Sequence, residues 1–236
     1  FLVDLKINKN LVFLFSYVLG MMIILLSGER SAIFLFIILS LLIFLFFPVK
    51  FYKKIFFSVS ILIIFLSSVL ISDNIKKRVL FETIDQIFKD NKIFIFSFGH
   101  QSHFKSAIEM IKKKPLTGIG PRNYRYECKK KEYEFIGKFR CSTHPHNTYL
   151  EIFAETGILG FLFVLIFFLY LIFLLIKIQF TKEKTSSLGF FFFLILILIN
   201  LFPLVPTGSF FNNWISFLYY LPIGFFLYQK KKLSNI

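Results

Sequence analysis

The sequence contains only two cysteines and 13 acidic residues among 236, and it lacks the patterns of several common functional sites. Two cysteines and two closely spaced histidines, with no acidic ligand pattern beside them, match no zinc spacing. The stretch GIGP at 118–121 is no dinucleotide fingerprint, because it lacks the third glycine and follows no strand. No Ser/His/Asp or Cys/His arrangement typical of nucleophilic catalysis is recognisable. We therefore expect neither a bound metal nor a cofactor.

The acidic residues are also too few to balance the basic ones, since 28 Lys and Arg against 13 Asp and Glu give a net charge of +15. In a soluble protein such an excess would suggest nucleic acid as a partner. Here 56% of the residues are hydrophobic, 20% are aromatic, and the mean hydropathy is +0.72. Basic residues at the ends of membrane spans set orientation and contact anionic head groups. We expect a membrane protein that contacts the lipid bilayer and no nucleic acid.

Several uncharged apolar runs approach the roughly 20 residues that span a bilayer. They lie at 11–27, 31–48, 55–71, 157–176, 188–205 and 210–228. The first two must be separate helices joined by a tight turn at 28–30, because one continuous helix would be about 55 Å long. Lysines mark the other ends of the spans, namely Lys6, Lys9, Lys50, Lys53, Lys54, Lys177, Lys182, Lys184, Lys230, Lys231 and Lys232. With these ends in the cytoplasm, the spans alternate without contradiction.

The expected fold class is all-α, a polytopic transmembrane helical bundle with a large external (periplasmic) loop containing short amphipathic helices. Residues 1–71 are expected to form three transmembrane helices, and residues 72–156 the periplasmic loop with the catalytic motifs. Residues 157–236 are expected to form three more transmembrane helices and a basic cytoplasmic C-terminus. The chain begins at Phe1, so we also expect that an N-terminal part is missing.

Three helices are expected in or next to the loop. The stretches 75–89 and 102–114 have the periodicity of amphipathic helices. The third is expected to begin at Thr148, where Glu151 would complete a capping box, and to run through Gly157 into the fourth span.

The loop also contains both cysteines of the chain, Cys128 and Cys141. In an oxidising compartment two such residues can form a disulfide. Two free thiols are the alternative, because the sequence does not fix the distance between their Cα atoms.

Among the polar residues, His146 is the first candidate for chemistry. It lies just before the expected N-terminus of the third helix, where an anion such as phosphate is favoured and a protonated imidazole is not. A neutral imidazole there could accept a proton. The alternative is a histidine that only forms a hydrogen bond within the loop.

Arginines form a second group of candidates. Arg30 lies between two spans with almost no loop, where it could reach a polar ligand; snorkelling to lipid phosphate or pairing with Glu29 is the alternative. Arg122 and Arg125 follow the glycine-containing turn and could bind a diphosphate, or they could form a solvated surface.

Three motifs in this order resemble the O-antigen ligase and polymerase family of bacterial envelope glycosyltransferases. They are SGERS at 27–31, AIEMIKKKPLTGIGPRNY at 107–124 and HPHNTYLEIFAETGILG at 144–160. The resemblance covers about residues 20–180. It implies a multi-pass protein of the bacterial inner membrane that transfers a glycan from an undecaprenyl-diphosphate donor to an acceptor hydroxyl, with inversion, without a metal, and on the periplasmic side.

The resemblance also implies roles for particular residues. His146 would take the proton from the acceptor hydroxyl, and Arg30 would stabilise the leaving diphosphate. Arg122, Arg125, His100 and Asn147 are the further candidates for binding the diphosphate. Members often carry an arginine near the position of His100. His100 would therefore supply a weaker cationic contact, or Arg122, Arg125 or Arg140 would replace the missing arginine, or activity would be reduced.

The sequence does not determine the acceptor. We expect the activity of an O-antigen ligase first, whose acceptor is lipid A–core. A polymerase would use another lipid-linked glycan as acceptor, and relatives use protein hydroxyls. A non-enzymatic transporter of lipid-linked glycans would bind the same diphosphate without chemistry.

Overall fold

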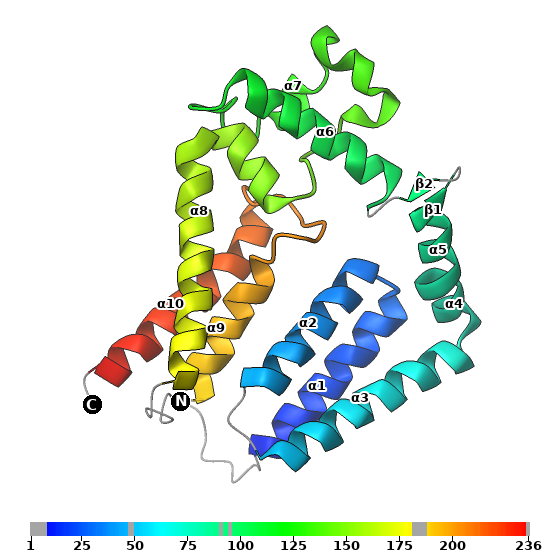
Figure 1. The fold of residues 1–236 in the computed structure, drawn as a ribbon, viewed down its shortest axis with the longest axis vertical. Helices are drawn as coiled ribbons and strands as arrows, with labels where there is room; N and C mark the ends of the chain where they lie inside the picture. Colours follow the sequence, from blue (N-terminus) through cyan, green and yellow to red (C-terminus); the bar gives the residue numbers. More distant parts are fainter. Residues whose placement is uncertain (1–8, 47–49, 90–91, 94–95, 181–187, 235–236) are drawn as a thin grey trace. The chain divides into compact units, whose positions relative to one another are not determined.

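The computed structural model is mostly helical in the residues that it describes (Figure 1). These residues are 9–46, 50–89, 92–93, 96–180 and 188–234. The chain forms two compact units, Phe1–Asp85 and Gln86–Ile236. Lys6, Lys182, Lys184 and the end of the second expected span lie outside the described residues.

Within the described residues, two helical stretches are long and apolar enough to cross a bilayer, Lys54–Ile71 and Thr148–Ile178. Three further helical stretches are apolar but shorter, namely Leu14–Ser27, Arg30–Phe46 and Gly189–Asn200. The structure is therefore a helical protein with membrane-like helices.

Three apolar helices begin the first unit, α1 (Lys9–Ser27), α2 (Arg30–Phe46) and α3 (Phe51–Ile71). Only residues 28–29 separate α1 from α2. The buried core of the unit consists of Met21, Leu25, Ile33, Val69 and Ile75. Many other large apolar side chains of these helices are exposed, which is typical of helix faces that contact lipid.

The segment after α3 is helical but irregular. It consists of α4 (Asp73–Lys76), a π-helical turn η1 (Lys77–Phe81) and α5 (Glu82–Ile87). Ser72 caps its start, because the Ser72 hydroxyl accepts a hydrogen bond from the backbone N–H of Ile75 at 3.4 Å. The strands β1 (Phe88–Lys89) and β2 (Lys92–Ile93) then form a short antiparallel hairpin. The expected helix over 75–89 is correct in type, but it starts earlier and ends before Phe88.

The second unit continues with α6 (Phe98–Lys113), which begins four residues before the expected start at 102. The reason is Ser97, whose hydroxyl accepts a hydrogen bond from the backbone N–H of His100 at 3.4 Å. Pro115 follows the helix and cannot continue it.

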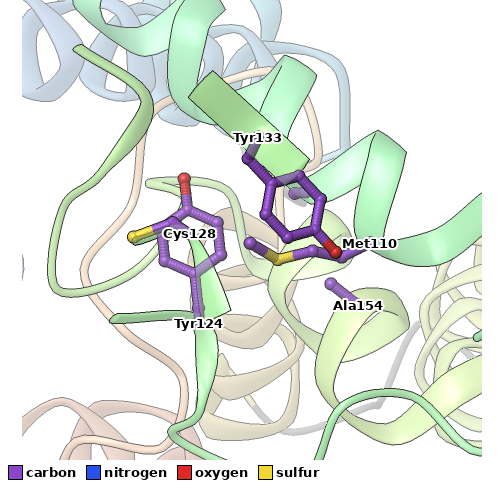
Figure 2. Close-up of a cluster of buried hydrophobic side chains, with 6 residues drawn as sticks. Met110, Tyr124, Cys128, Tyr133 and Ala154 are labelled. Atoms are coloured by element: carbon purple, nitrogen blue, oxygen red, sulfur yellow. The ribbon is translucent and has the colours of Figure 1, made fainter. Parts of the chain in front are cut away.

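Short helical turns follow α6, namely α7 (Tyr124–Glu127), η2 (Lys131–Ile136) and η3 (Lys138–Arg140). They pack on α6 and on the next helix around a small buried core. Figure 2 shows its labelled members, Met110, Tyr124, Cys128, Tyr133 and Ala154. The hydroxyl of its member Tyr124 donates to the carbonyls of His103 and Arg140, both at 3.1 Å.

The long helix α8 (Thr148–Phe180) consists of two sections that meet at Gly157, and Figure 1 shows the bend. Gly157 has a left-handed φ of 72° and breaks the helix. The backbone of the turn 115–120 runs against this break: Ile158 N–H donates to the Pro115 carbonyl at 2.8 Å, and Gly120 N–H donates to the Glu155 carbonyl at 2.9 Å. The expectation of one continuous helix through Gly157 is therefore wrong.

The expected capping box at the start of α8 is also wrong. Asn147 caps the helix, because its Oδ1 accepts hydrogen bonds from the backbone N–H groups of Tyr149 at 3.1 Å and Leu150 at 3.0 Å. Thr148 bonds instead to the hydroxyls of Thr207 at 2.9 Å and Tyr219 at 3.1 Å.

Two helices complete the unit, α9 (Leu188–Asn200) and α10 (Asn213–Ser234), and they lie side by side (Figure 1). Helix α9 ends five residues before the end of the expected span 188–205, and α10 begins three residues after the start of the expected span 210–228. Residues 201–212 form an irregular segment instead. Pro203 and Pro206 favour this, because an interior proline removes a backbone hydrogen bond and tends to kink or break a helix.

Candidate functional site

All four histidines of the chain lie together in the second unit. His100 and His103 share one face of α6, and His144 and His146 lie in the segment that leads to α8. The ring centroid of His146 is 4.1 Å from that of His144, 5.1 Å from His100 and 5.2 Å from His103. We call these residues the four-histidine cluster, and His146 is its central member.

The backbone and the ring of His146 are both held in place. Its φ of 58° lies in the left-handed region, which costs a non-glycine residue about 1 kcal/mol or more. Its carbonyl accepts a hydrogen bond from the Thr207 N–H at 3.0 Å, and its Nε2 lies 2.9 Å from the hydroxyl of Ser142. The surrounding structure therefore fixes the direction of the imidazole.

Burial and the neighbouring imidazoles favour the neutral form of His146. Burial lowers the pKa of His146 to about 4, and the charges of His144, His100 and His103 would lower it further if these rings were protonated. Burial also lowers the pKa values of His103 and His144. Near neutral pH, the ring of His146 is thus an imidazole with one nitrogen able to accept a proton.

Asn147 lies beside the cluster and is buried. In addition to capping α8, its Nδ2 donates a hydrogen bond to the Pro203 carbonyl at 2.8 Å. Its side chain thus connects the start of α8 to the irregular segment 201–212.

Two buried carboxylates on α8 were not identified as site residues from the sequence. Glu151 accepts hydrogen bonds from the Ser209 hydroxyl at 2.5 Å and the Phe210 N–H at 2.7 Å. Glu155 accepts from the Tyr124 N–H at 3.0 Å and from the Arg122 N–H. Their spacing of four residues places both on one side of the first section of α8. This spacing was the one signal in the sequence that could have indicated that the two side chains lie on the same side of the helix.

The two arginines that follow the glycine-containing turn, Arg122 and (in α7) Arg125, differ in their surroundings. Arg122 is exposed and has a left-handed φ of 61°. The Nε of Arg125 is buried and has no hydrogen-bond partner among the described residues. Burial is the main cause that lowers the pKa of His144, and the positive charge of Arg125 lowers it further. The guanidinium of Arg125 thus contributes to the electrostatics of the cluster.

A disulfide joins Cys128, just after α7, to Cys141, with a Cα–Cα distance of 5.3 Å. Cys141 begins the segment that carries His144 and His146. The residue before Cys141 is Arg140, and its carbonyl accepts hydrogen bonds from the Ser106 hydroxyl at 2.8 Å and the Tyr124 hydroxyl at 3.1 Å. The base of this segment is therefore bonded to α6 and α7.

Arg30 belongs to the first unit, where it is the first residue of α2. Its Nη1 donates to the Glu82 carbonyl at 3.3 Å. Arg78, in the π-helical turn η1, donates to the Ser27 carbonyl at 2.9 Å. A cavity of about 360 Å³ lies at this turn, lined in part by Gly28, Arg78 and Glu82. Arg78 is a cation that was not singled out from the sequence.

Among the described residues, no group of three or more His, Cys, Asp or Glu side chains is arranged to hold a metal ion. The four imidazoles are close to each other, but their nitrogens do not form a ligand set.

A family model described as O-antigen ligase matches residues 15–165, which is more than half of the chain. The matched range contains Arg30, the turn 115–120 and the whole four-histidine cluster. No curated protein and no solved structure matches the chain.

Proposed function

Because the chain belongs to the O-antigen ligase family, we propose that it is a bacterial membrane glycosyltransferase that uses an undecaprenyl-diphosphate-linked glycan as donor. The observation that carries this proposal is His146, a half-buried, neutral imidazole at the centre of the four-histidine cluster. A positioned base of this kind suits the activation of an acceptor hydroxyl.

In the proposed reaction, His146 takes the proton of the acceptor hydroxyl. The acceptor oxygen forms a bond to the anomeric carbon of the donor sugar from the face opposite the leaving group. The bond between that carbon and the diphosphate oxygen breaks, and undecaprenyl diphosphate leaves with the bonding electrons. Inversion at the anomeric carbon follows from this single displacement.

Positive groups would stabilise the charge that develops on the leaving diphosphate, without a metal ion. We propose Arg30 for this role in catalysis. Arg122, Arg125, His100 and Asn147 are the proposed binding residues, and the buried, unpartnered Nε of Arg125 supports the choice of this residue.

We further propose that the protein is a multi-pass bundle in the bacterial inner membrane, with the cluster facing the periplasm. The exposed apolar side chains of α1, α2 and α3 support contact with lipid. The disulfide between Cys128 and Cys141 supports an oxidising compartment for the segment 96–147.

Lipid A–core is the proposed acceptor, because the matching family is described as O-antigen ligase. Product analysis distinguishes this activity from others. A ligase forms glycan attached to lipid A–core, a polymerase extends lipid-linked glycan, and a transporter changes neither.

The decisive experiment replaces His146 by alanine in purified protein supplied with lipid-linked donor and acceptor. We expect the transfer rate to fall by about 10²–10⁴-fold, while donor binding is retained. Lys129→Ala, an exposed replacement in the same unit, serves as the matched control and should transfer at the wild-type rate. Unchanged transfer by His146→Ala would show that His146 is not the base.

A further inference from the structure

The irregular segment 201–212, between α9 and α10, lies beyond the residues that the family model matches. It is nevertheless bonded to the start of α8 near both of its ends. The Leu201 carbonyl accepts a hydrogen bond from the Tyr149 hydroxyl at 2.7 Å, and the Phe210 N–H donates one to Glu151 at 2.7 Å. The segment is therefore fixed to the helix that follows the two histidines of the loop.

Thr207, near the middle of this segment, is bonded through its N–H, its carbonyl and its hydroxyl. The N–H donates to the His146 carbonyl at 3.0 Å, and the carbonyl lies 3.1 Å from Nε2 of His144. The hydroxyl lies 2.9 Å from that of Thr148, which is almost completely buried. Thr207 thus contacts three alternate residues of the stretch, and the proposed base is the middle one.

The contact with His144 determines the tautomer of that ring. A carbonyl oxygen only accepts, so Nε2 of His144 carries a hydrogen and donates it to Thr207. Burial lowers the pKa of His144, so its ring is neutral near pH 7 and its Nδ1 has a lone pair. This Nδ1 accepts a hydrogen bond from the Thr143 hydroxyl at 2.9 Å. Both nitrogens of His144 are therefore engaged within the protein, which makes His144 a poor base.

The contact with His146 acts on the backbone. The N–H of Thr207 fixes the peptide group that follows His146, a residue whose φ of 58° costs a non-glycine residue about 1 kcal/mol or more. Without this donor His146 could relax to an ordinary negative φ. Since the side chain leaves the chain at the same Cα atom, the imidazole would then point in another direction.

We infer that Thr207 is a positioning residue of the proposed active site, which fixes the direction of His146 and engages His144, so that His146 is left to act as the base. Thr207 acts through the two histidines and takes no proton itself. This inference rests on the proposed function, because the base is that of the glycosyl transfer. It also extends the site to a part of the chain that the family model does not match.

The tautomer of His144 can be measured without any substrate. Solid-state ¹⁵N NMR of histidine-labelled protein in lipid nanodiscs, at about pH 7.5, should show His144 with its hydrogen on Nε2 and a lone pair on Nδ1. The spectrum of His144→Gln identifies the signals, because they disappear in this variant. A wild-type His144 that carries its hydrogen on Nδ1 would overturn the inference.

Transfer kinetics test the contact with His146. Replacing Thr207 by its α-hydroxy acid turns the amide into an ester, which removes the N–H and keeps the side chain. We expect kcat to fall about 10–10²-fold while KM changes by less than about twofold, because the base is misdirected but the substrates still bind. A wild-type kcat in the folded ester variant would overturn the inference.

The same replacement at Ser216, in α10, is the matched control. It removes an N–H that donates to the Asn212 carbonyl at 2.8 Å, so it also deletes one backbone hydrogen bond of the second unit. We expect a lower unfolding temperature and an unchanged kcat. A loss of kcat at Ser216 as large as that at Thr207 would mean that Thr207 has only a general structural role, and the inference would fail.

Two replacements of His144 separate hydrogen bonding from proton transfer. The side-chain amide of His144→Gln can still donate to the Thr207 carbonyl, so its kcat should stay within about threefold of the wild type, whereas His144→Phe has no donor and should lose about tenfold. A loss of about 10²-fold or more in His144→Gln would show that His144 is itself a base and contradict the inference. The expected tautomer in a wild type without any transfer would refute the proposed function alone, and normal transfer by the Thr207 ester would refute this inference alone.

Discussion

In the unit Phe1–Asp85, Arg30 and Arg78 each donate one hydrogen bond to a backbone carbonyl. Arg30 bonds to the carbonyl of Glu82 and Arg78 to that of Ser27. In the unit Gln86–Ile236, the segment around His146 is held by a disulfide, a buried core and bonds to the segment 201–212. A catalytic base needs a fixed direction, which packed side chains and supporting hydrogen bonds supply. The segment of His146, our proposed base, is held by more kinds of contact than the two arginines of the first unit.

Among the replacements considered, Gly157→Ala should destabilise the second unit most. A Cβ at this position would collide with the Leu116 carbonyl, and the φ of 72° is unfavourable for alanine. We expect a loss of about 3–5 kcal/mol in the free energy of unfolding and a matching loss of transfer. Thermal unfolding in detergent measures the first effect.

Gly99→Ala is the matched control for this replacement. Gly99 lies in α6, and a Cβ there meets no other atom within 4 Å. We expect Gly99→Ala to keep or slightly raise stability, by at most about 1 kcal/mol. If both variants unfold at the same temperature, the contact between Gly157 and the turn 115–120 is not required for folding.

Removing the disulfide should have the second largest effect. The bridge between Cys128 and Cys141 closes a loop with a sequence separation of 13, for which about 3 kcal/mol is typical. The variant with both cysteines replaced by alanine should unfold at a lower temperature and transfer more slowly. Dithiothreitol should reproduce these losses in the wild type and have no effect on the variant. A wild type that is insensitive after complete reduction would show that the bridge does not position His146.

Arg30 tests the first unit. Arg30→Lys keeps the positive charge but loses the planar fork that binds phosphate oxygens, so we expect kcat/KM to fall at least about tenfold. Arg78→Lys should have a smaller effect, because Arg78 is not among the residues proposed to contact the diphosphate. Steady-state kinetics with a lipid-linked donor measures both. A wild-type rate for Arg30→Lys would favour snorkelling to lipid phosphate.

The low pKa of His146 predicts a dependence of stability on pH in the protein without ligand. Its pKa is about 4 in the folded state and about 6.5 in the unfolded state, so the unfolded state binds more protons between these values. Stability should therefore fall as the pH falls from 6.5 toward 4, by about 1 kcal/mol after allowing for the half-exposed ring. Histidine-selective ¹⁵N NMR should show a neutral His146 at pH 5.5. A titration of His146 near pH 6.5 would mean that burial does not lower its pKa.

The sequence predicted α1 and α2 well, because long uncharged apolar runs determine these helices. It failed at two places for different reasons. The break at Gly157 depends on the carbonyls of the turn 115–120, which is distant in the chain, whereas the end of α9 is marked by the nearby Pro203 and Pro206. Neither effect is visible in hydropathy.

The candidate site shows the same division. His146 and His100 could be singled out one by one, from the helix start and from the resemblance to a family. His103 was missed, because a histidine three residues after another on an amphipathic helix looks like part of its polar face. Only the fold brings α6 beside the segment before α8 and shows that His146 is surrounded by imidazoles.

The smallest effect is expected for Tyr124→Phe, which removes one hydroxyl and keeps the ring in the buried core shown in Figure 2. This hydroxyl lies 3.1 Å from the carbonyls of His103 and Arg140, but the Arg140 carbonyl also accepts a hydrogen bond from Ser106. Since one acceptor keeps a partner, we expect a loss of about 0.5–1 kcal/mol in unfolding free energy. Double-mutant analysis with Ser106→Ala should give a loss larger than the sum of the two single losses, because the Arg140 carbonyl is then left without these donors. Strictly additive losses would mean that the hydrogen bonds of Tyr124 and Ser106 to the Arg140 carbonyl stabilise the segment that carries His146 independently of each other.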